Sequence, residues 1–178
     1  MSIILVPLDF SECGPNVVAE AVRFARAFEA SLLLLHASVT PRGLPLTATV
    51  QPPGSPTPLT VEALLRRDAD ALLAPLLGAA REGGVRADGL VAFGPIAATI
   101  LDVATREGAA MILMGTHGRT GLARVTMGSI AEEVVRHADV PVITVRTRHH
   151  AGCAARSCAA CGLRRSEAER ALDAEDAG

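Results

Sequence analysis

The chain has 178 residues, of which 49% are hydrophobic, and a formal net charge of −2. This length suits one domain of common size with ample apolar surface for a core. All 17 basic residues are arginine, which excludes chemistry that needs a P-loop, Schiff-base or kinase lysine. The charges are dispersed and only 2% of the residues are aromatic. We therefore expect no nucleic-acid binding, by charge or by base stacking, and no polybasic membrane anchor.

The N-terminus predicts a cytoplasmic protein. It has no basic segment and reaches Pro7 and Asp9 too soon for a signal peptide. No apolar run of the sequence approaches the roughly 18 residues of a membrane span. In the cytoplasm we expect the four cysteines to be reduced thiols or metal ligands rather than disulfides.

The first part of the chain predicts two buried strands joined by an amphipathic helix. Apolar runs at 2–8 and 31–37 are typical of strands covered on both faces. Between them, apolar residues recur every three or four positions over 12–29, and Ser11 is placed to cap this helix. His36 lies in the second run, where we expect a core histidine with satisfied hydrogen bonds rather than a ligand.

A proline-rich segment follows the second strand. Residues 38–59 hold six prolines and predict an irregular loop, either a lid or a linker. Thr60 is placed to cap a helix that runs to about Arg81, where Gly83 and Gly84 follow.

The rest of the chain completes an alternating order of strands and helices. We expect strands at 85–93, 109–114 and 140–145, and helices at 95–107 and 129–137. This order predicts a five-stranded parallel sheet with helices on both faces, which is a Rossmann-like α/β fold. A proline inside the last strand favours an edge position for that strand.

One glycine pattern points to phosphate binding. Gly115 and Gly118 follow the fourth apolar run, and nine residues later Gly128 precedes Ser129. Glycines let backbone N–H groups approach an anion, and a serine that opens a helix adds a hydroxyl beside unpaired amides. The alternative is a tight turn that needs glycine only for its geometry, with Ser129 as a helix cap.

Several short motifs resemble the universal stress protein family. They are Val6-Pro7-Leu8-Asp9-Phe10-Ser11, Gly94-Pro95, Met114-Gly115-Thr116-His117-Gly118-Arg119, Gly128-Ser129-Ile130 and Val140-Pro141-Val142. The resemblance covers roughly residues 1–147, and its specificity comes from the order and distances of the motifs. It implies a fold similar to the adenine-nucleotide alpha hydrolases, with ATP, accompanied by Mg²⁺, at the carboxyl ends of the central strands.

The resemblance also implies which residues would hold the nucleotide. Leu8 and Asp9 would contact the adenosine part, and Ala37 would offer backbone groups to adenine. The phosphates would lie along Met114, Gly115, His117, Gly118, Arg119, Gly128, Ser129 and Ile130. Two simpler interpretations stay open: Asp9 could cap the first helix, and His117 and Arg119 could be solvated loop residues.

The composition changes near residue 147, and we treat 148–178 as a separate tail. The tail carries soft metal ligands at His149, His150, Cys153, Cys158 and Cys161. These suffice for a tetrahedral zinc site, although a second Cys-x2-Cys pair is missing. A disordered tail with incidental thiols is the alternative, and Cys13, far from the tail in sequence, is expected to be a packing residue inside the first helix.

Together these features predict an ATP-binding universal stress protein that acts as a homodimeric regulatory or sensing module, paired through its last strand. No catalytic residue is assigned, because the sequence has no nucleophile elbow, no evident carboxylate pair and no identifiable base. Two alternatives remain: a slow nucleotide hydrolase or adenylyl-transferring relative using the same pocket, and a metal- or redox-responsive interaction protein governed by the tail.

Overall fold

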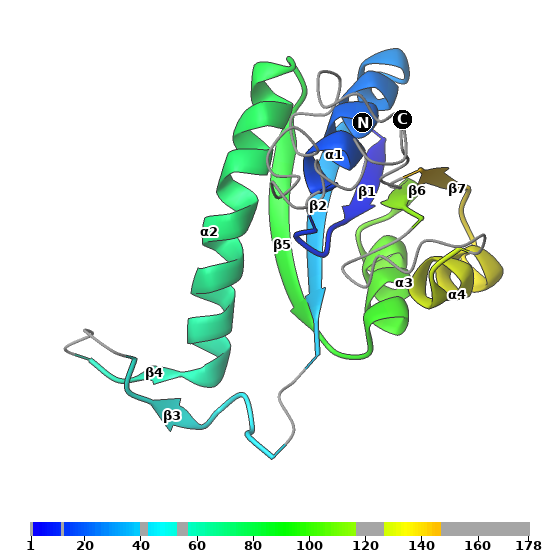
Figure 1. Cartoon of the computed structure of the whole chain (residues 1–178). Coiled ribbons are helices and arrows are strands. Elements are labelled where there is room, and N and C mark those ends of the chain that lie inside the picture. Colours follow the sequence, from blue (N-terminus) through cyan, green and yellow to red (C-terminus); the bar gives the residue numbers. More distant parts are fainter. Residues whose placement is uncertain (1, 12, 40–42, 53–56, 117–126, 147–178) are drawn as a thin grey trace, which may run out of the picture.

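The computed structural model describes residues 2–11, 13–39, 43–52, 57–116 and 127–146, and these form an α/β fold (Figure 1). In chain order its elements are β1 (Ile3–Pro7), α1 (Gly14–Ala27), β2 (Ser31–Ser38), β3 (Thr49–Val50), β4 (Leu59–Thr60), α2 (Val61–Glu82), β5 (Ala87–Phe93), α3 (Ile96–Arg106), β6 (Ala109–Gly115), α4 (Ser129–His137) and β7 (Val142–Val145). None of the helices in this part of the chain combines the length and hydrophobicity needed to cross a membrane.

Five strands form one parallel sheet in the order β5-β2-β1-β6-β7, which confirms the predicted fold class. From β1 the chain winds outward through β2 to β5 and then returns to the other side of β1 for β6 and β7. The direction of winding therefore reverses between β1 and β6. In an open α/β sheet, such a switch point leaves a crevice at the carboxyl ends of the two strands, where ligands bind.

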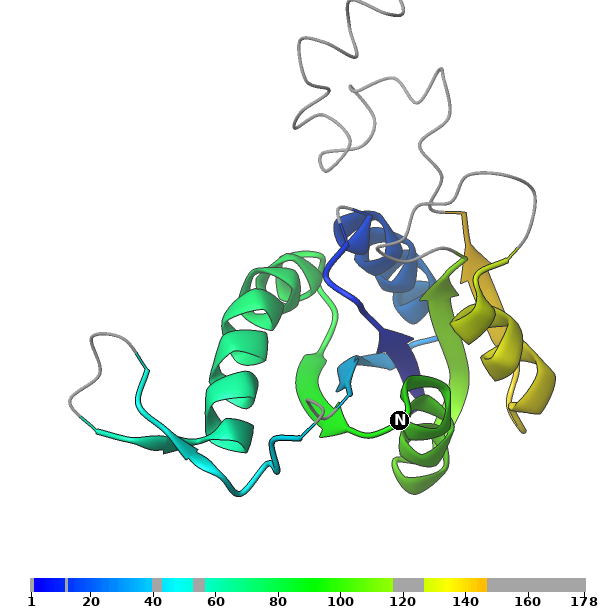
Figure 2. The ribbon, with the colours of Figure 1, turned by 60° about the horizontal axis from the view of Figure 1, so that its bottom comes forward.

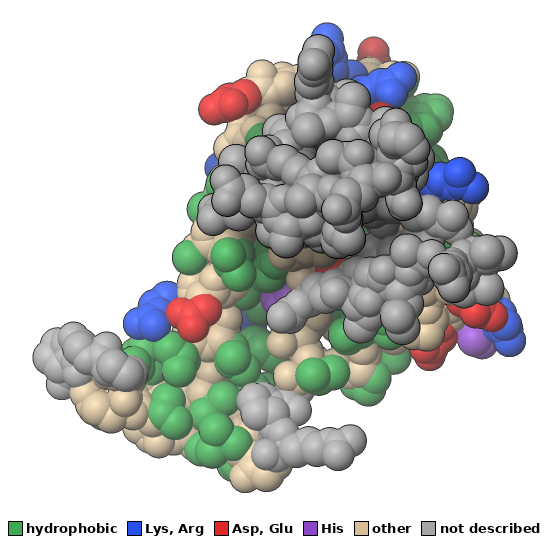
Figure 3. Space-filling view, viewed as in Figure 1, with side chains coloured by type: hydrophobic (Ala, Val, Ile, Leu, Met, Phe, Trp, Pro, Cys, Tyr) green, Lys and Arg blue, Asp and Glu red, His purple; other side chains and the backbone are tan. Residues whose placement is uncertain are grey.

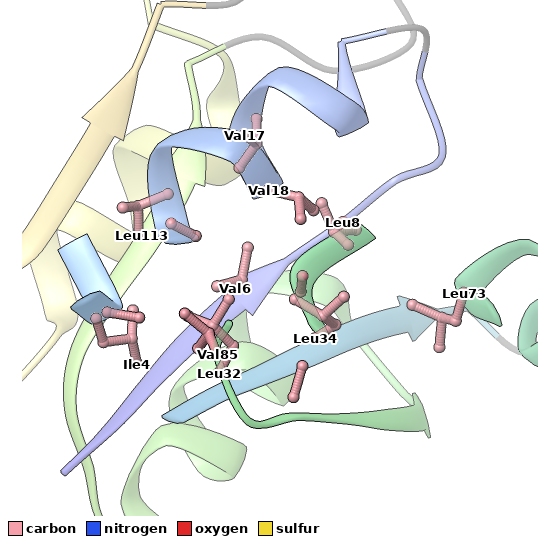
Figure 4. Packing of buried hydrophobic residues seen from close by; sticks show 14 of the residues in the cluster. Ile4, Val6, Leu8, Val17, Val18, Leu32, Leu34, Leu73, Val85 and Leu113 are labelled. Carbon is pink, nitrogen blue, oxygen red and sulfur yellow. The ribbon is translucent and has the colours of Figure 1, made fainter. Parts of the chain in front are cut away.

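Helices cover both faces of this sheet, as predicted (Figure 2). On one face, α1 and α2 enclose a core that includes Val6, Leu34 and Leu113 (Figure 4). On the other face, α3 and α4 pack over Leu5 and Ile112. The central strands are covered on both faces, which explains their nearly continuous apolar sequences.

The first helix begins later than the sequence predicts. It starts at Gly14 rather than at residue 12, and Cys13 rather than Ser11 stands at its N-cap. Asp9 and the left-handed backbone of Phe10 (φ 57°) build a turn ahead of the helix, and the Ser11 carbonyl accepts the Gly14 N–H at 2.9 Å. Cys13 is buried, although it precedes the helix in which it was placed.

The proline-rich segment contains secondary structure where an irregular loop is predicted. β3 and β4 pair in antiparallel fashion and project as a hairpin beside the start of α2 (Figures 1 and 2). Each strand has only two residues, too few to produce a period in the sequence. Hydrophobic side chains gather over this hairpin and the adjoining part of α2 (Figure 3).

The other boundaries agree closely with the predictions. Thr60 is the N-cap of α2, with its side chain accepting the Ala63 N–H at 3.1 Å, and the helix continues through Pro75 to Glu82. α4 has the predicted bounds. β7 lies at a sheet edge, as predicted, but begins at Val142, two residues later than expected.

Arginine side chains from α2 cover the outer edge of β5. Along β5, the Ala87 carbonyl accepts from Arg81 at 2.7 and 3.1 Å, and the Val91 carbonyl accepts from Arg66 at 2.9 Å. Both carbonyls face away from β2, because the Arg86 carbonyl between α2 and β5 bonds to the Leu32 N–H of β2 and neighbouring residues alternate. Two arginines of α2 thus occupy the free edge of β5.

Candidate functional site

A cavity of about 410 Å³ lies at the carboxyl ends of β1, β2 and β6, beside the first turns of α1, α3 and α4. Its lining contains every predicted nucleotide-site residue of the described chain, namely Leu8, Asp9, Ala37, Met114, Gly115, Gly128, Ser129 and Ile130. These residues are separated by up to 122 positions in sequence (from 8 to 130), and the sheet topology brings them to one crevice.

The other predicted ligands lie outside the described residues. This holds for His117, Gly118 and Arg119 of the glycine motif. It also holds for the tail residues His149, His150, Cys153, Cys158 and Cys161. Within the described part of the chain, no group of three or more His, Cys, Asp or Glu side chains is arranged to hold a metal ion.

The first turn of α4 presents three backbone donors beside the cavity. Gly128 is the N-cap and has no side chain to cap the helix, and its own N–H donates to the Thr116 carbonyl at 2.8 Å. The first intrahelical bond runs from Glu132 back to Gly128 at 2.9 Å. Among the described residues, the N–H groups of Ser129, Ile130 and Ala131 therefore have no acceptor. They lie at the positive end of the helix dipole, which favours an anion.

The first turn of α1 is built differently. Pro15 has no N–H, and the Gly14 N–H donates to the Ser11 carbonyl at 2.9 Å. The next two amides, of Asn16 and Val17, donate to the Cys13 carbonyl at 3.1 and 3.2 Å. This helix end borders the cavity through Gly14 and Val17, but its amides already have acceptors.

Asp9 combines a turn role with a position in the cavity. Its Oδ1 accepts the Ser11 N–H at 3.0 Å, which stabilises the turn between β1 and α1. Asp9 does not cap α1 itself, because four residues separate it from the start of that helix at Gly14. Among the described lining residues it is the one carboxylate, and no hydrogen bond within the described part of the chain involves its second oxygen.

His36 lines the cavity, which the sequence interpretation missed. Its position in an apolar run suggested a core residue, and its hydrogen bond is indeed satisfied, with Nδ1 2.9 Å from the Leu8 carbonyl oxygen. However, the ring is only half-buried and stacks on Phe10 with 4.2 Å between ring centroids. The available signal was its place one residue before Ala37 at the end of β2.

Other lining residues that were not predicted lie at the ends of strands, in the turns that follow those strands, or in the first turns of helices. They are Pro7, Ser11, Gly14, Val17, Ser38, Val39, Ile96, Ile100, Thr116 and Ala131. Ile96 and Ile100 come from the first turns of α3, which gives the cavity an aliphatic wall. Such a wall agrees with the scarcity of aromatic residues in this sequence.

The sequence of the described domain matches a known family. The model of the Universal stress protein family matches residues 1–146, which is most of the chain. The chain belongs to the universal stress protein family. This confirms the resemblance stated for its motifs. A universal stress protein of Methanocaldococcus jannaschii, MJ0531, is 30% identical over 145 residues, covering 80% of this chain and 81% of that relative.

Solved universal stress protein structures have the same fold. Protein MJ0577 of M. jannaschii superposes with a TM-score of 0.66 at 21% identity, over 84% of this chain and 98% of its own. A universal stress protein in complex with cAMP gives 0.58 at 19% identity, and one from Archaeoglobus fulgidus in complex with dAMP gives 0.57 at 20%. These two cover 82% and 81% of this chain, respectively, and 97% of their own chains.

Proposed function

We propose that this universal stress protein binds an adenine nucleotide, ATP with Mg²⁺, in the cavity and acts in the cytoplasm as a nucleotide-dependent regulatory module of a stress response. The observation that carries the proposal is the first turn of α4. Ser129, Ile130 and Ala131, whose N–H groups have no acceptor among the described residues, line the same cavity as Asp9 and Ala37. Donors of this kind are suited to phosphate oxygens.

The opposite side of the cavity suits a nucleoside. Ala37 and the residues after it end β2 beside Leu8 and Ile96, so a base would lie between aliphatic side chains and backbone groups. The Asp9 carboxylate is an acceptor for ribose hydroxyls. Mg²⁺ commonly binds through nucleotide phosphates, waters and one or two carboxylates, and Asp9 is available for that role. The family structures that hold cAMP and dAMP support an adenine nucleotide as the ligand.

A charge introduced at Ser129 tests this proposal. In nucleotide-free protein, titration calorimetry should show binding of ATP and AMP. In Ser129→Asp, the carboxylate would accept hydrogen bonds from the α4 amides and repel the phosphate. We therefore expect nucleotide affinity to fall at least about 100-fold. Folding should persist, because an acidic residue in the first turn stabilises a helix by about 0.3–1 kcal/mol.

The matched control is Thr60→Asp, which places the same charge at the N-cap of α2, outside the cavity lining. Aspartate caps a helix as well as threonine does, so affinity and thermal stability should stay as in the wild type. Equal affinities of wild type and Ser129→Asp would contradict the proposed phosphate site.

The outer edge of β7 supports a homodimer as the assembly. The arginines of α2 occupy the free edge of β5, whereas no hydrogen bond among the described residues involves the outward-facing backbone of Val142 and Thr144. The bonds from Ile112 to Pro141 and from Thr116 to Val145 identify the residues that face β6. An unpaired strand edge is suited to pairing with a second copy across a two-fold axis.

Thr144→Pro tests that dimer. The Thr144 N–H faces away from β6, so proline would remove a donor from the free edge while the bonds between β6 and β7 remain. We expect light scattering to report dimers for the wild type and for Thr144→Ser, and monomers for Thr144→Pro. A monomeric wild type, or dimers that persist with proline, would exclude pairing through β7.

A further inference from the structure

His36 lies in β2 at a position where the alternation of buried apolar residues predicts an aliphatic side chain. Leu32 and Leu34 point to the face covered by α1 and α2 and belong to its core (Figure 4). His36 is the next residue in that row, because side chains of a strand alternate between the faces. A polar ring at the end of an apolar row requires a hydrogen-bond partner.

The partner of His36 is the backbone of the neighbouring strand. Its Nδ1 lies 2.9 Å from the Leu8 carbonyl oxygen. A carbonyl oxygen only accepts, so Nδ1 carries the proton and donates. The N–H of Leu8 meanwhile donates to the Leu35 carbonyl at 2.8 Å, which continues the regular pairing of the two strands one residue beyond the end of β1.

The His36 bond replaces a regular bond of the sheet. Pro7 is opposite Leu35 in the parallel register, so a regular ladder would pair the Leu8 carbonyl with the Ala37 N–H. No backbone hydrogen bond among the described residues joins these two groups. The Ala37 backbone faces the side of β2 on which β1 has ended, and Ala37 lines the cavity. Among the described residues, the Ala37 N–H thus has no partner at the site.

The same ring supports the turn that carries Asp9. Phe10 has a φ of 57°, a conformation that bulky residues rarely adopt. Its ring stacks on His36 with centroids 4.2 Å apart and planes 28° apart. His36 therefore contacts this turn at two points, the Leu8 carbonyl and the Phe10 ring, on either side of Asp9.

We infer that His36 is a positioning residue for the base of the nucleotide: by engaging the Leu8 carbonyl it keeps the Ala37 N–H available to the ligand. The inference rests on the proposed function and adds to it the residue that keeps the Ala37 backbone available for the base. The N–H and C=O of Ala37 point to the same side of the strand. This donor and acceptor complement N1 and the N6 amino group of adenine, whereas guanine presents the opposite order with N1–H and O6.

Amide hydrogen exchange at Ala37 tests the inference directly in nucleotide-free protein. We expect this amide to exchange rapidly in the wild type, and at least about tenfold more slowly in His36→Leu, where the Leu8 carbonyl becomes free to accept it. AMP affinity should fall about 5- to 10-fold in His36→Leu, the equivalent of one hydrogen bond. His36→Asn keeps an N–H near the position of Nδ1, so exchange and affinity should stay within about twofold of the wild type.

His137 provides the matched control. Its Nδ1 lies 2.9 Å from the Glu133 carbonyl oxygen, in an exposed position at the end of α4 and outside the cavity lining. His137→Leu removes the same kind of bond, and we expect it to change neither Ala37 exchange nor AMP affinity.

Each outcome decides one of the two proposals. Slow Ala37 exchange in the wild type, or equal exchange in the wild type and His36→Leu, overturns the positioning role of His36, and the wild-type measurement serves even if His36→Leu does not fold. AMP affinity that is unchanged in His36→Leu overturns it as well. If the exchange rates are as expected but the wild type binds no nucleotide, the proposed function is contradicted. The effect of His36 on the Ala37 amide would still stand.

Discussion

The first turns of α1 and α4 border the same cavity, and each follows a central strand of the sheet, yet they offer a ligand different chemistry. In α1, a proline and the turn carbonyls of Ser11 and Cys13 account for the first amides. In α4, a glycine N-cap without a side chain leaves three amides without acceptors in the described chain. A helix that begins at a strand end is thus not sufficient for an anion site. The residues just before the helix decide whether its donors are available.

This difference assigns separate roles to the two sides of the crevice. The α4 side provides donors and is suited to phosphate, whereas the turn before α1 provides the Asp9 carboxylate, which is an acceptor. A nucleotide carries acceptors on its phosphates and donors on its ribose. It would therefore lie across the crevice with its phosphates at α4 and its ribose at the turn before α1.

The largest effect on nucleotide affinity is expected when α4 is given a proline in its first turn, as α1 has. Ser129→Pro removes one open N–H and the hydroxyl at the first helical position, where proline is best tolerated. The preceding Gly128 has an extended backbone (φ −63°, ψ 149°), which suits a residue before proline. We expect AMP affinity, measured by calorimetry, to fall about 100-fold with little loss of thermal stability.

Ser129→Ala is the control for this variant, because it removes the hydroxyl and keeps the amide. Its affinity should fall by less than about tenfold. If the alanine and proline variants bind equally weakly, the hydroxyl rather than the backbone holds the phosphate, and the contrast between the two helices would not explain binding.

A smaller effect is expected on the α1 side, at Asp9. Asp9→Asn keeps an oxygen for the Ser11 N–H and removes the charge, so we expect nearly unchanged stability and about tenfold weaker nucleotide binding. Asp9→Ala loses the turn bond as well, and its free energy of unfolding should fall by about 1–2 kcal/mol in denaturant titrations. Wild-type affinity in Asp9→Asn would reduce Asp9 to a turn residue.

The smallest effect on binding is expected at Pro15. This exposed residue stands in the first turn of α1, and Pro15→Ala adds an N–H there. Stability should fall by about 0.5–1 kcal/mol, because the unfolded chain gains freedom, and AMP affinity should stay within about twofold. Tighter binding of AMP by Pro15→Ala would show that α1 also contributes to the phosphate site.

Much of this fold could be predicted from the sequence, because its central strands are covered on both faces and appear as apolar runs. The capping threonine of α2 and the serine that opens α4 marked those helix starts correctly, although Gly128 rather than Ser129 is the N-cap of α4. The predicted start of α1 was wrong because the turn before this helix depends on a positive φ at Phe10, which a phenylalanine in the sequence does not indicate. The two-residue strands β3 and β4 are too short for any period to be visible.

The resemblance implied Leu8, Asp9, Met114 and Gly115 as site residues, and the structure brings them together in the lining of one cavity. His36 was missed, although it directly precedes Ala37 in the sequence. Its alternation with Leu32 and Leu34 correctly indicates the core face of β2, but the row ends where β1 leaves the sheet, and only the three-dimensional register reveals that. Which α4 amides lack an acceptor among the described residues likewise depends on the hydrogen bonds at the start of the helix, such as that from Gly128 to Thr116, which no sequence pattern specifies.

The most direct test of this account is an NMR titration of ¹⁵N-labelled, nucleotide-free protein with AMP, following the backbone amides of both helix starts. We expect large, saturable shifts at Ser129, Ile130 and Ala131, and much smaller ones at Gly14 and Asn16. Saturable shifts confined to the α1 amides, or no shifts at the α4 amides while AMP binds, would contradict it.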